Sequence, residues 1–181
     1  DYALYISVTD EDIASDENLL RLKSQTTITQ YYEGYGWYPD DELDVTETYK
    51  VYSYSDDLLS VTGTPADLLG PVTLASGWNW ISYLPQSNLD VPTALLSLLD
   101  IDENGEEYSK ASLLKNQSQI TNYYTGYGWY GTLDDMAPGG GYIIYMLEEG
   151  ELIYVDPSDI SRTYQEENEV FVSDLWDLNI Y

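Results

Sequence analysis

One internal repeat constrains this chain more than any other feature of its sequence. Residues 23–38 and residues 115–130 match at 11 of 16 positions without a gap, and the two segments lie 92 residues apart. Self-similarity at a fixed spacing is the signature of proteins built from repeated structural units. Because the chain has 181 residues, it holds two periods almost in full, and we expect it to fold as two related units.

The same register extends in both directions from these segments. Downstream, residues 49–52 lie over residues 142–145, and upstream the run that begins at Ala3 aligns with the run that begins at Ala94. The first copy therefore lacks the opening segment of the second, residues 77–83. A weaker version of that segment stands at residues 176–181.

This phase divides the chain into three parts. Residues 1–65 form a first repeat that lacks its opening strand, and residues 66–157 form a complete second repeat. Residues 158–181 form a linker followed by the opening strand of a further repeat. The chain therefore begins partway through one repeat unit and ends partway through another. Its last part is a candidate for an exchanged terminal strand.

Alternating apolar and polar residues predict strands in both repeats. The clearest runs are residues 49–54, 78–83, 142–146 and 152–155, which are rich in residue types that favour pleated sheets. Residues 91–99 favour a helix, with Asp90 as its N-cap and Pro92 in its first turn. We therefore expect a mainly β chain of two tandem small antiparallel β modules, each with at most one short helix.

An open edge in the first repeat needs a strand to cover it, because each buried backbone group left unpaired costs about 1–3 kcal/mol. Residues 170–181 either fold back onto their own first repeat or complete that of another molecule, which builds an open filament. In a third alternative, the chain is a slice of a longer array. The apolar residues that would anchor a donated strand are Val170, Val172, Leu175, Trp176, Leu178 and Ile180.

The charge balance excludes several classes of partner and site. The chain carries 33 acidic and 6 basic residues, a formal net charge of −27, and it has neither His nor Cys. Such a chain repels nucleic acid and anionic lipid, and it lacks the usual ligands of zinc and haem and the parts of a Ser-His-Asp triad. No apolar run is long enough to cross a membrane. No carboxylate pair stands out as the acid and base of a glycosidase, so we expect no enzyme.

Four motifs of the second repeat occur in a fixed order. They are W-N-x-I-S-Y in residues 78–83, K-x-Q in residues 115–117, Y-x-G-Y-G-W in residues 124–129 and P-G-x-G-Y in residues 138–142. In this combination the chain resembles a tandem repeat module of large secreted and cell-surface proteins of marine bacteria and algae. The resemblance implies an extracellular, non-catalytic accessory repeat at the cell surface. The first repeat departs from it, since residues 44–49 replace the P-G-x-G-Y turn.

One acidic loop matches the first half of a calcium-binding loop. Asp100, Asp102 and Asn104 alternate before Gly105, as oxygen ligands do when they converge on one ion. Ala111 stands where a bidentate Glu should close the loop, so Glu106 or Glu107 would have to substitute. The two alternatives are a calcium site and a solvated acidic loop, and we expect no other cofactor.

Tyrosine and tryptophan recur at equivalent positions in the two repeats. Tyr35 and Trp37 in the first copy correspond to Tyr127 and Trp129 in the second. Aromatic rings combine an apolar face with a polar edge, so these residues suit a module core, a subunit interface or a platform for sugar rings. Asn116 begins an acceptor sequon for N-glycosylation that the first copy lacks.

These expectations converge on an extracellular structural protein. Its leading form is the subunit or repeat segment of a surface filament or appendage, assembled by β-strand exchange, with copies of itself as partners. The alternative is a carbohydrate-binding or adhesive accessory module of a large secreted protein, with glycans as partners.

Overall fold

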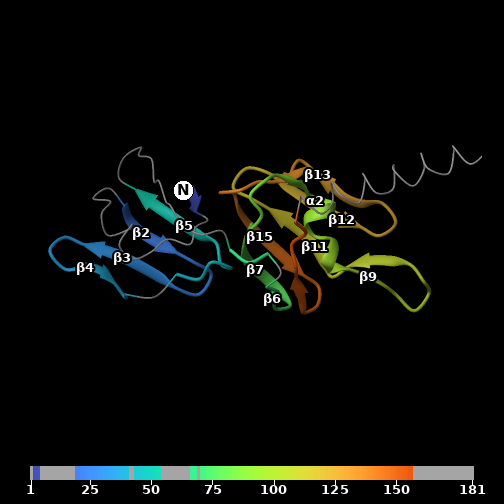
Figure 1. Cartoon of the computed structure of the whole chain (residues 1–181), viewed down its shortest axis with the longest axis horizontal. Helices are drawn as coiled ribbons and strands as arrows, with labels where there is room; N and C mark the ends of the chain where they lie inside the picture. The colour runs from blue at the N-terminus through green and yellow to red at the C-terminus, as the bar shows by residue number, and fades with distance from the viewer. Residues whose placement is uncertain (1, 5–18, 41–42, 54–65, 69, 157–181) are drawn as a thin grey trace, which may run out of the picture.

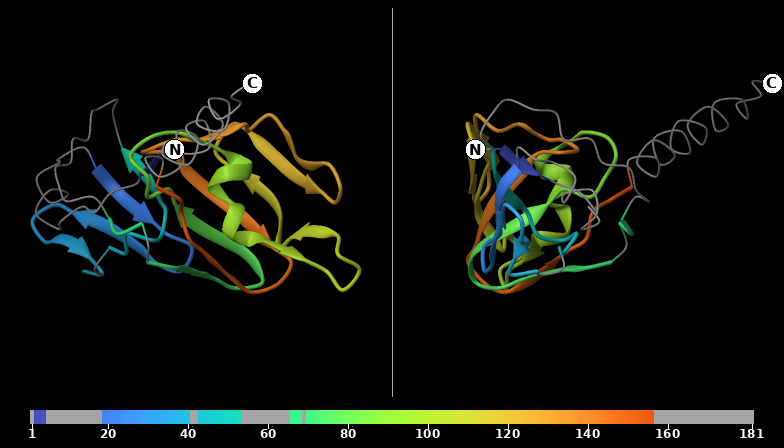
Figure 2. Two further views of the ribbon diagram at one scale, coloured as in Figure 1. Left: turned by 45° about the vertical axis from the view of Figure 1, so that its right-hand side comes forward. Right: turned by 90° about the vertical axis from the view of Figure 1, so that its left-hand side faces the viewer.

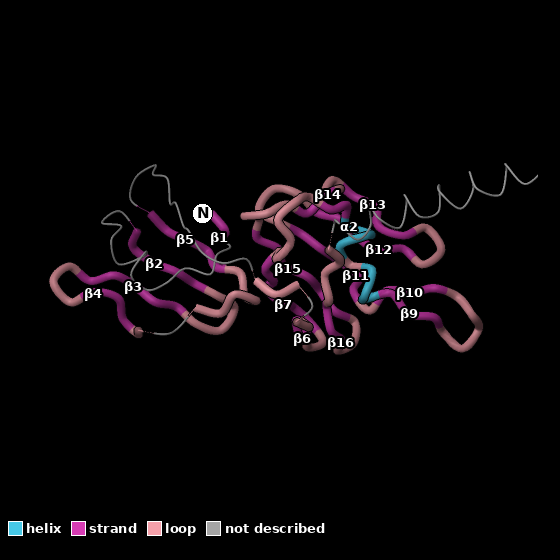
Figure 3. Tube along the Cα trace, in the orientation of Figure 1, coloured by secondary structure: helices cyan, strands magenta, loops and turns pink. Residues whose placement is uncertain are grey.

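The computed structural model describes residues 2–4, 19–40, 43–53, 66–68 and 70–156, and there the chain is mainly β. The strands form two five-stranded antiparallel sheets and three two-stranded ones (Figure 1). Helix is confined, in this part of the chain, to α2 (Val91–Ala94) and the 3₁₀ turn η1 (Leu96–Leu98), both in the second half (Figure 3). The prediction of a mainly β chain with small antiparallel sheets and little helix is confirmed.

The first five-stranded sheet contains the first copy of the repeat, and its strand order is β1-β5-β2-β3-β4. Leu22 and Val51 lie opposite each other in this sheet and are both buried. Its strands are β1 (Tyr2–Leu4), β2 (Leu19–Lys23), β3 (Ile28–Tyr32), β4 (Gly36–Tyr38) and β5 (Tyr49–Ser53).

The second five-stranded sheet contains the second copy, in the order β13-β12-β11-β15-β7. Its strands are β7 (Gly77–Ser82), β11 (Ala111–Lys115), β12 (Ile120–Tyr124), β13 (Gly128–Gly131) and β15 (Gly141–Met146). Three further pairs surround it: β6 (Val72–Leu74) with β16 (Gly150–Leu152), β8 (Leu89–Asp90) with β14 (Asp135–Met136), and β9 (Leu99–Ile101) with β10 (Glu107–Ser109).

The main core lies between α2, η1 and one face of the second sheet (Figure 2). Tyr142, Ile144 and Met146 alternate with half-buried residues along β15, so one face of this strand is fully covered. Leu95 and Leu98, from the helical segment, belong to the same buried cluster. Burial of apolar surface in this cluster is what holds the short helical turn in place, since so short a helix is unstable alone.

The matching segments of the two repeats build the same turns. Ser24 Oγ accepts hydrogen bonds from the Thr26 and Thr27 amides, and Asn116 Oδ1 accepts them from the Ser118 and Gln119 amides. The next turn repeats as well, because Gly34 and Gly126 have φ angles of 80° and 79°. Equivalent residues therefore fix equivalent backbone at the start of both β3 and β12 and at their ends.

The edge of the first sheet differs from the sequence-based expectation. We expected this edge to be open, with the run from Ala3 equivalent to the run from Ala94, but β1 pairs with β5 there. Ala3 lies opposite Lys50, as Trp80 of β7 lies opposite Ile143 of β15. Any extended segment within reach gains hydrogen bonds at such an edge, and β1 supplies three paired residues where β7 supplies six.

The helix also differs in detail from its prediction over residues 91–99. It begins at Val91 with Pro92 in its first turn, as predicted, but it gives way to a 3₁₀ turn after Ala94. Asp90 occupies the N-cap position without a side-chain capping bond. The Val91 amide instead donates to the Asp134 carbonyl oxygen, because β8 already pairs with β14 beside it.

Candidate functional site

A glutamine side chain of the first repeat is hydrogen-bonded to the outer edge of β7. Gln25 Nε2 donates to the Trp78 carbonyl oxygen at 2.7 Å, and the Trp80 amide donates to Gln25 Oε1 at 2.8 Å. The side-chain amide thus takes the place that a peptide group of a neighbouring strand would occupy. Unpaired edge groups are otherwise free to bind another chain.

The same edge is also bonded to the backbone just before β5. The Ser82 amide donates to the Thr46 carbonyl oxygen at 3.0 Å, and Ser82 Oγ donates to the Glu47 carbonyl oxygen at 2.6 Å. Asp44 Oδ1 shapes this loop by accepting hydrogen bonds from the Thr46 amide and hydroxyl, both at 2.8 Å. Strand β7 is therefore hydrogen-bonded on one side to β15 and on the other side to the first repeat. We call this contact the joint.

Two lysines lie over the two tryptophans of β7 at the joint. Lys50 Nζ is 5.1 Å from the centre of the Trp80 ring, and Lys115 Nζ is 4.8 Å from that of Trp78. The Trp78 ring also meets Tyr145 edge to face, with centroids 4.9 Å apart. Each cation–π contact is worth about 0.5–1 kcal/mol at an exposed site, so the rings help to hold the ammonium groups in place.

A cavity of about 330 Å³ opens beside these lysines. Lys50 and Thr48 line it from the first repeat, and Trp80, Lys115 and Gln117 line it from the second. None of the described residues that line it is acidic. In a chain with 33 acidic residues, a cavity walled by two ammonium groups and no described carboxylate is suited to an anion.

Two more basic residues lie on the same face of the first sheet as Lys50. Lys23 is the cross-strand partner of Lys50, and Arg21 is the partner of Tyr52, with its guanidinium carbon 5.2 Å from the centre of that ring. Residues two apart on a strand share a face, so all three cations of this sheet point the same way. With Lys115, four of the six basic residues of the chain gather on or beside the joint.

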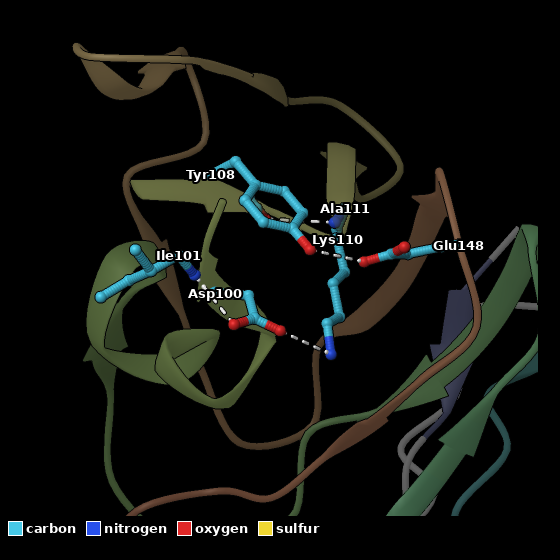
Figure 4. Close-up of polar contacts among 7 residues, drawn as sticks. Asp100, Ile101, Tyr108, Lys110, Ala111 and Glu148 are labelled. Atoms are coloured by element: carbon cyan, nitrogen blue, oxygen red, sulfur yellow. Dashed lines mark hydrogen bonds and ion pairs between the residues drawn. The ribbon is translucent and has the colours of Figure 1, made fainter. Parts of the chain in front are cut away.

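The predicted calcium residues lie on the β9–β10 hairpin, and Figure 4 shows Asp100 with its polar contacts. Asp100 Oδ2 pairs with Lys110 Nζ at 3.2 Å, and Asp100 Oδ1 accepts a hydrogen bond from the Ile101 amide. These two contacts hold the pKa of the Asp100 carboxyl below its ordinary value, the Ile101 amide contributing most. At the same base, the Tyr108 hydroxyl donates to Glu148 Oε1 at 3.1 Å.

The tip of this hairpin is closed by Asp102 itself. Its Oδ1 accepts hydrogen bonds from the Asn104 amide at 2.8 Å and the Glu106 amide at 2.9 Å, and the Glu106 contact is the main cause of the lowered pKa of Asp102. Gly105 completes the turn with a φ angle of 83°. No cluster of three metal-ligating side chains occurs among the described residues. The calcium site therefore stays a prediction, and the loop folds through hydrogen bonds of its own.

The four residues of the predicted sugar platform lie in two kinds of environment. Tyr35 and Tyr127 sit at hairpin ends with 93% and 91% of their surface exposed. Trp37 and Trp129 are half-buried, and each meets a neighbouring tyrosine of its own repeat. Trp129 also packs against the main core, which favours the core interpretation for that residue.

The remaining predicted site residues fall in two places. Asn116 lies in the β11–β12 turn, where its Nδ2 donates to Gln119 Oε1 at 3.3 Å, and it also lines the cavity at the joint. The proposed donor-strand anchors, Val170, Val172, Leu175, Trp176, Leu178 and Ile180, lie outside the described residues.

Sequence reasoning missed the joint as a site. The one sequence signal for the joint was the K-x-Q motif, which occurs in both copies. The first copy of the motif contains Gln25, and the second contains Lys115. The cavity itself gathers residues from four strands, β5, β7, β11 and β15, and from the segments next to them, so no local pattern marks it.

Comparisons with known protein families, with characterised proteins and with solved structures found no match. Among the described residues, no helix is both long and apolar enough to cross a membrane.

Proposed function

We propose that this chain is a repeat segment of an extracellular structural protein, in which β modules join through their edge strands and build a surface filament. In this proposal the chain has no catalytic role, and its partners are copies of itself. The joint is the observation that supports it. One edge strand, β7, serves two neighbouring units at once, through its ladder with β15 and through Gln25 and Ser82.

In this proposal the donated strand replaces β1 at the edge of β5. Of the described residues, β1 pairs with three residues of β5, whereas β7 pairs with six residues of β15. A longer strand of the same type gains further backbone hydrogen bonds at this edge, each with a net contribution of about 0.5–1.5 kcal/mol. Residues 176–181 resemble the sequence of β7, so they have the pattern that such a donor needs.

Deletion of residues 168–181 tests the proposal. We expect the full chain to form concentration-dependent filaments in electron micrographs and the truncated chain to sediment as a monomer of unchanged secondary structure. Filaments formed equally well by the truncated chain would contradict strand donation.

A matched pair of variants separates the donor strand from a general effect of the terminus. Replacement of Trp176, Leu178 and Ile180 by aspartate removes the apolar face of the donor, because residues two apart share a face. Replacement of Asp177 and Asn179 by alanine changes the other face of the same segment. We expect only the first variant to abolish assembly, and loss in both or neither would count against the proposal.

A further inference from the structure

Two lysine side chains line the cavity at the joint, and neither makes one of the hydrogen bonds that form the joint. Lys50 and Lys115 come from different repeats and converge on one cavity of about 330 Å³. Within the described residues the one ion pair joins Lys110 to Asp100, so neither Lys50 nor Lys115 has a carboxylate within 4.0 Å there. In an acidic protein a surface lysine is expected to pair with a carboxylate. In the described residues these two lysines instead make cation–π contacts with tryptophan rings.

The lysines are positioned in advance of any ligand. Each ammonium group lies about 5 Å from the centre of a β7 tryptophan ring, at 5.1 Å for Trp80 and 4.8 Å for Trp78. Since Lys loses much rotamer freedom on binding, a contact that already orients the side chain lowers that entropic cost. The remaining donors of the ammonium groups are free to bind an anion, because a π face accepts no directed hydrogen bond.

The uncharged residues that line the cavity indicate which class of molecule could bear the anionic group. Gln117 offers an exposed side-chain amide, and the Asn116 amide keeps one N–H beyond its bond to Gln119 Oε1. Such amide groups form hydrogen bonds with the hydroxyls of a sugar. Ile143 and Gly141 add an apolar patch beside Trp80. The volume lies at the lower end of the range of small-ligand pockets, about 300–1,000 Å³, and suits one or two sugar units.

We propose that the cavity at the joint binds an acidic saccharide, with the carboxylate or sulfate of one sugar unit held between Lys50 and Lys115 and its hydroxyls on Asn116 and Gln117. This inference concerns a site and a ligand class, and it holds whether or not the chain forms filaments. The net charge of −27 does not forbid the ligand, because at 0.15 M salt distant charges are screened beyond about 8 Å and the two ammonium groups act at contact.

Titration calorimetry of the full chain at 0.15 M salt tests the site. The ligands are a galacturonic acid trimer, the methyl ester of the same trimer and a sulfated galactose trimer. We expect saturable binding of the acid trimer, the sulfated trimer or both, with a Kd on the order of 0.1–1 mM, and at least tenfold weaker binding of the ester. The two acidic ligands show which anion the site prefers. Binding of the ester as tight as that of the preferred acidic trimer, or no binding of either acidic trimer, would overturn the proposal.

Charge-matched variants locate the binding on the chain. Lys50→Gln and Lys115→Gln should each weaken binding at least fivefold, and the double variant should abolish it. Lys110→Gln removes the same charge five residues from Lys115, about 16 Å along the strand, and should bind like the parent chain. Unchanged binding in the double variant, or an equal loss in Lys110→Gln, would place the ligand elsewhere.

A peptide ligand provides the last comparison. Triglutamate carries carboxylates but no hydroxyl-bearing ring, so it should bind at least tenfold more weakly than the acid trimer. If it binds as tightly, the cavity recognises acidic chain segments and the saccharide proposal is wrong. Circular dichroism of every variant at the working temperature confirms that the fold is kept.

Discussion

Replacement of Tyr154 by alanine is expected to lower the free energy of unfolding by about 3–5 kcal/mol, the range for loss of a buried aromatic ring. Tyr154 is 2% exposed, and its ring meets Tyr83 edge to face at 5.4 Å. Its hydroxyl donates to the Ser82 carbonyl oxygen at 2.5 Å, so the residue ties the segment after β16 to β7. A domain is stable by only about 5–15 kcal/mol, so the loss is a large share of the whole.

Urea denaturation of two further variants separates the contribution of the Tyr154 ring from that of its hydroxyl and provides a surface control. Tyr154→Phe keeps the ring and loses one buried hydrogen bond, so it should cost about 1–2 kcal/mol. Tyr127→Ala removes a tyrosine that is 91% exposed and should change stability by less than about 0.5 kcal/mol. If Tyr154→Ala were as mild as Tyr127→Ala, the packing of Tyr154 in the core would be wrong.

Alkaline pH is expected to unfold the chain steeply above pH 10. Burial, followed by the neighbouring Tyr142 phenol, raises the pKa of Tyr83, and burial with the nearby Tyr83 and Tyr142 raises that of Tyr154 well above its ordinary value. Above pH 10 the unfolded chain loses these protons while the folded chain keeps them. Stability is therefore complete below pH 10 and falls above it, by about 1.4 kcal/mol per pH unit for each such tyrosine.

Denaturation curves between pH 8 and pH 11, with tyrosinate absorbance recorded in parallel, measure this slope. Other tyrosines also ionise and add negative charge, so the variant Tyr154→Phe isolates one buried group. The variant should be less stable than the parent at pH 8, and its slope above pH 10 should be shallower by about 1.4 kcal/mol per pH unit. Equal slopes would show that Tyr154 titrates in the folded state.

The sequence predicts the strands well where alternation is long. In β15 three buried residues alternate with half-buried ones, and the predicted run of residues 142–146 coincides with the observed strand from Gly141 to Met146. The repeat also predicts that equivalent residues make equivalent turns, as the bonds of Ser24 and Asn116 show. Local chemistry decides these features, and local patterns therefore reveal them.

The features that sequence did not reveal depend on contacts between distant segments. The pairing of Tyr2–Leu4 with β5 was missed because a short run carries too little periodicity to compete with an alignment to residues 94–104. The joint depends on Gln25 meeting Trp78 and Trp80 across more than fifty residues, and the K-x-Q motif that contains Gln25 does not show which residues it contacts. The two lysines of the cavity could not be predicted either, because their neighbours are set by the meeting of two sheets.

Disulfide trapping tests whether the donated strand passes from one molecule to another. The chain has no cysteine of its own, so any disulfide must form between the introduced cysteines. In the second sheet Trp80 lies opposite Ile143, and the equivalent residues are Leu178 in the donor segment and Lys50 in β5. Opposite residues of antiparallel strands have Cα atoms about 4.5–5.5 Å apart, within the reach of a disulfide.

Oxidation of the double variant Lys50→Cys with Leu178→Cys, followed by a non-reducing gel, is the measurement. If strands are donated between molecules, we expect a ladder of covalent dimers, trimers and higher multimers that returns to monomer on reduction. The control pair Ser118→Cys with Leu178→Cys should give no ladder. A monomer closed by an internal disulfide would show that the segment folds back on its own chain, and no disulfide above the level of the control pair would show that it does not reach β5. Either result would contradict strand exchange.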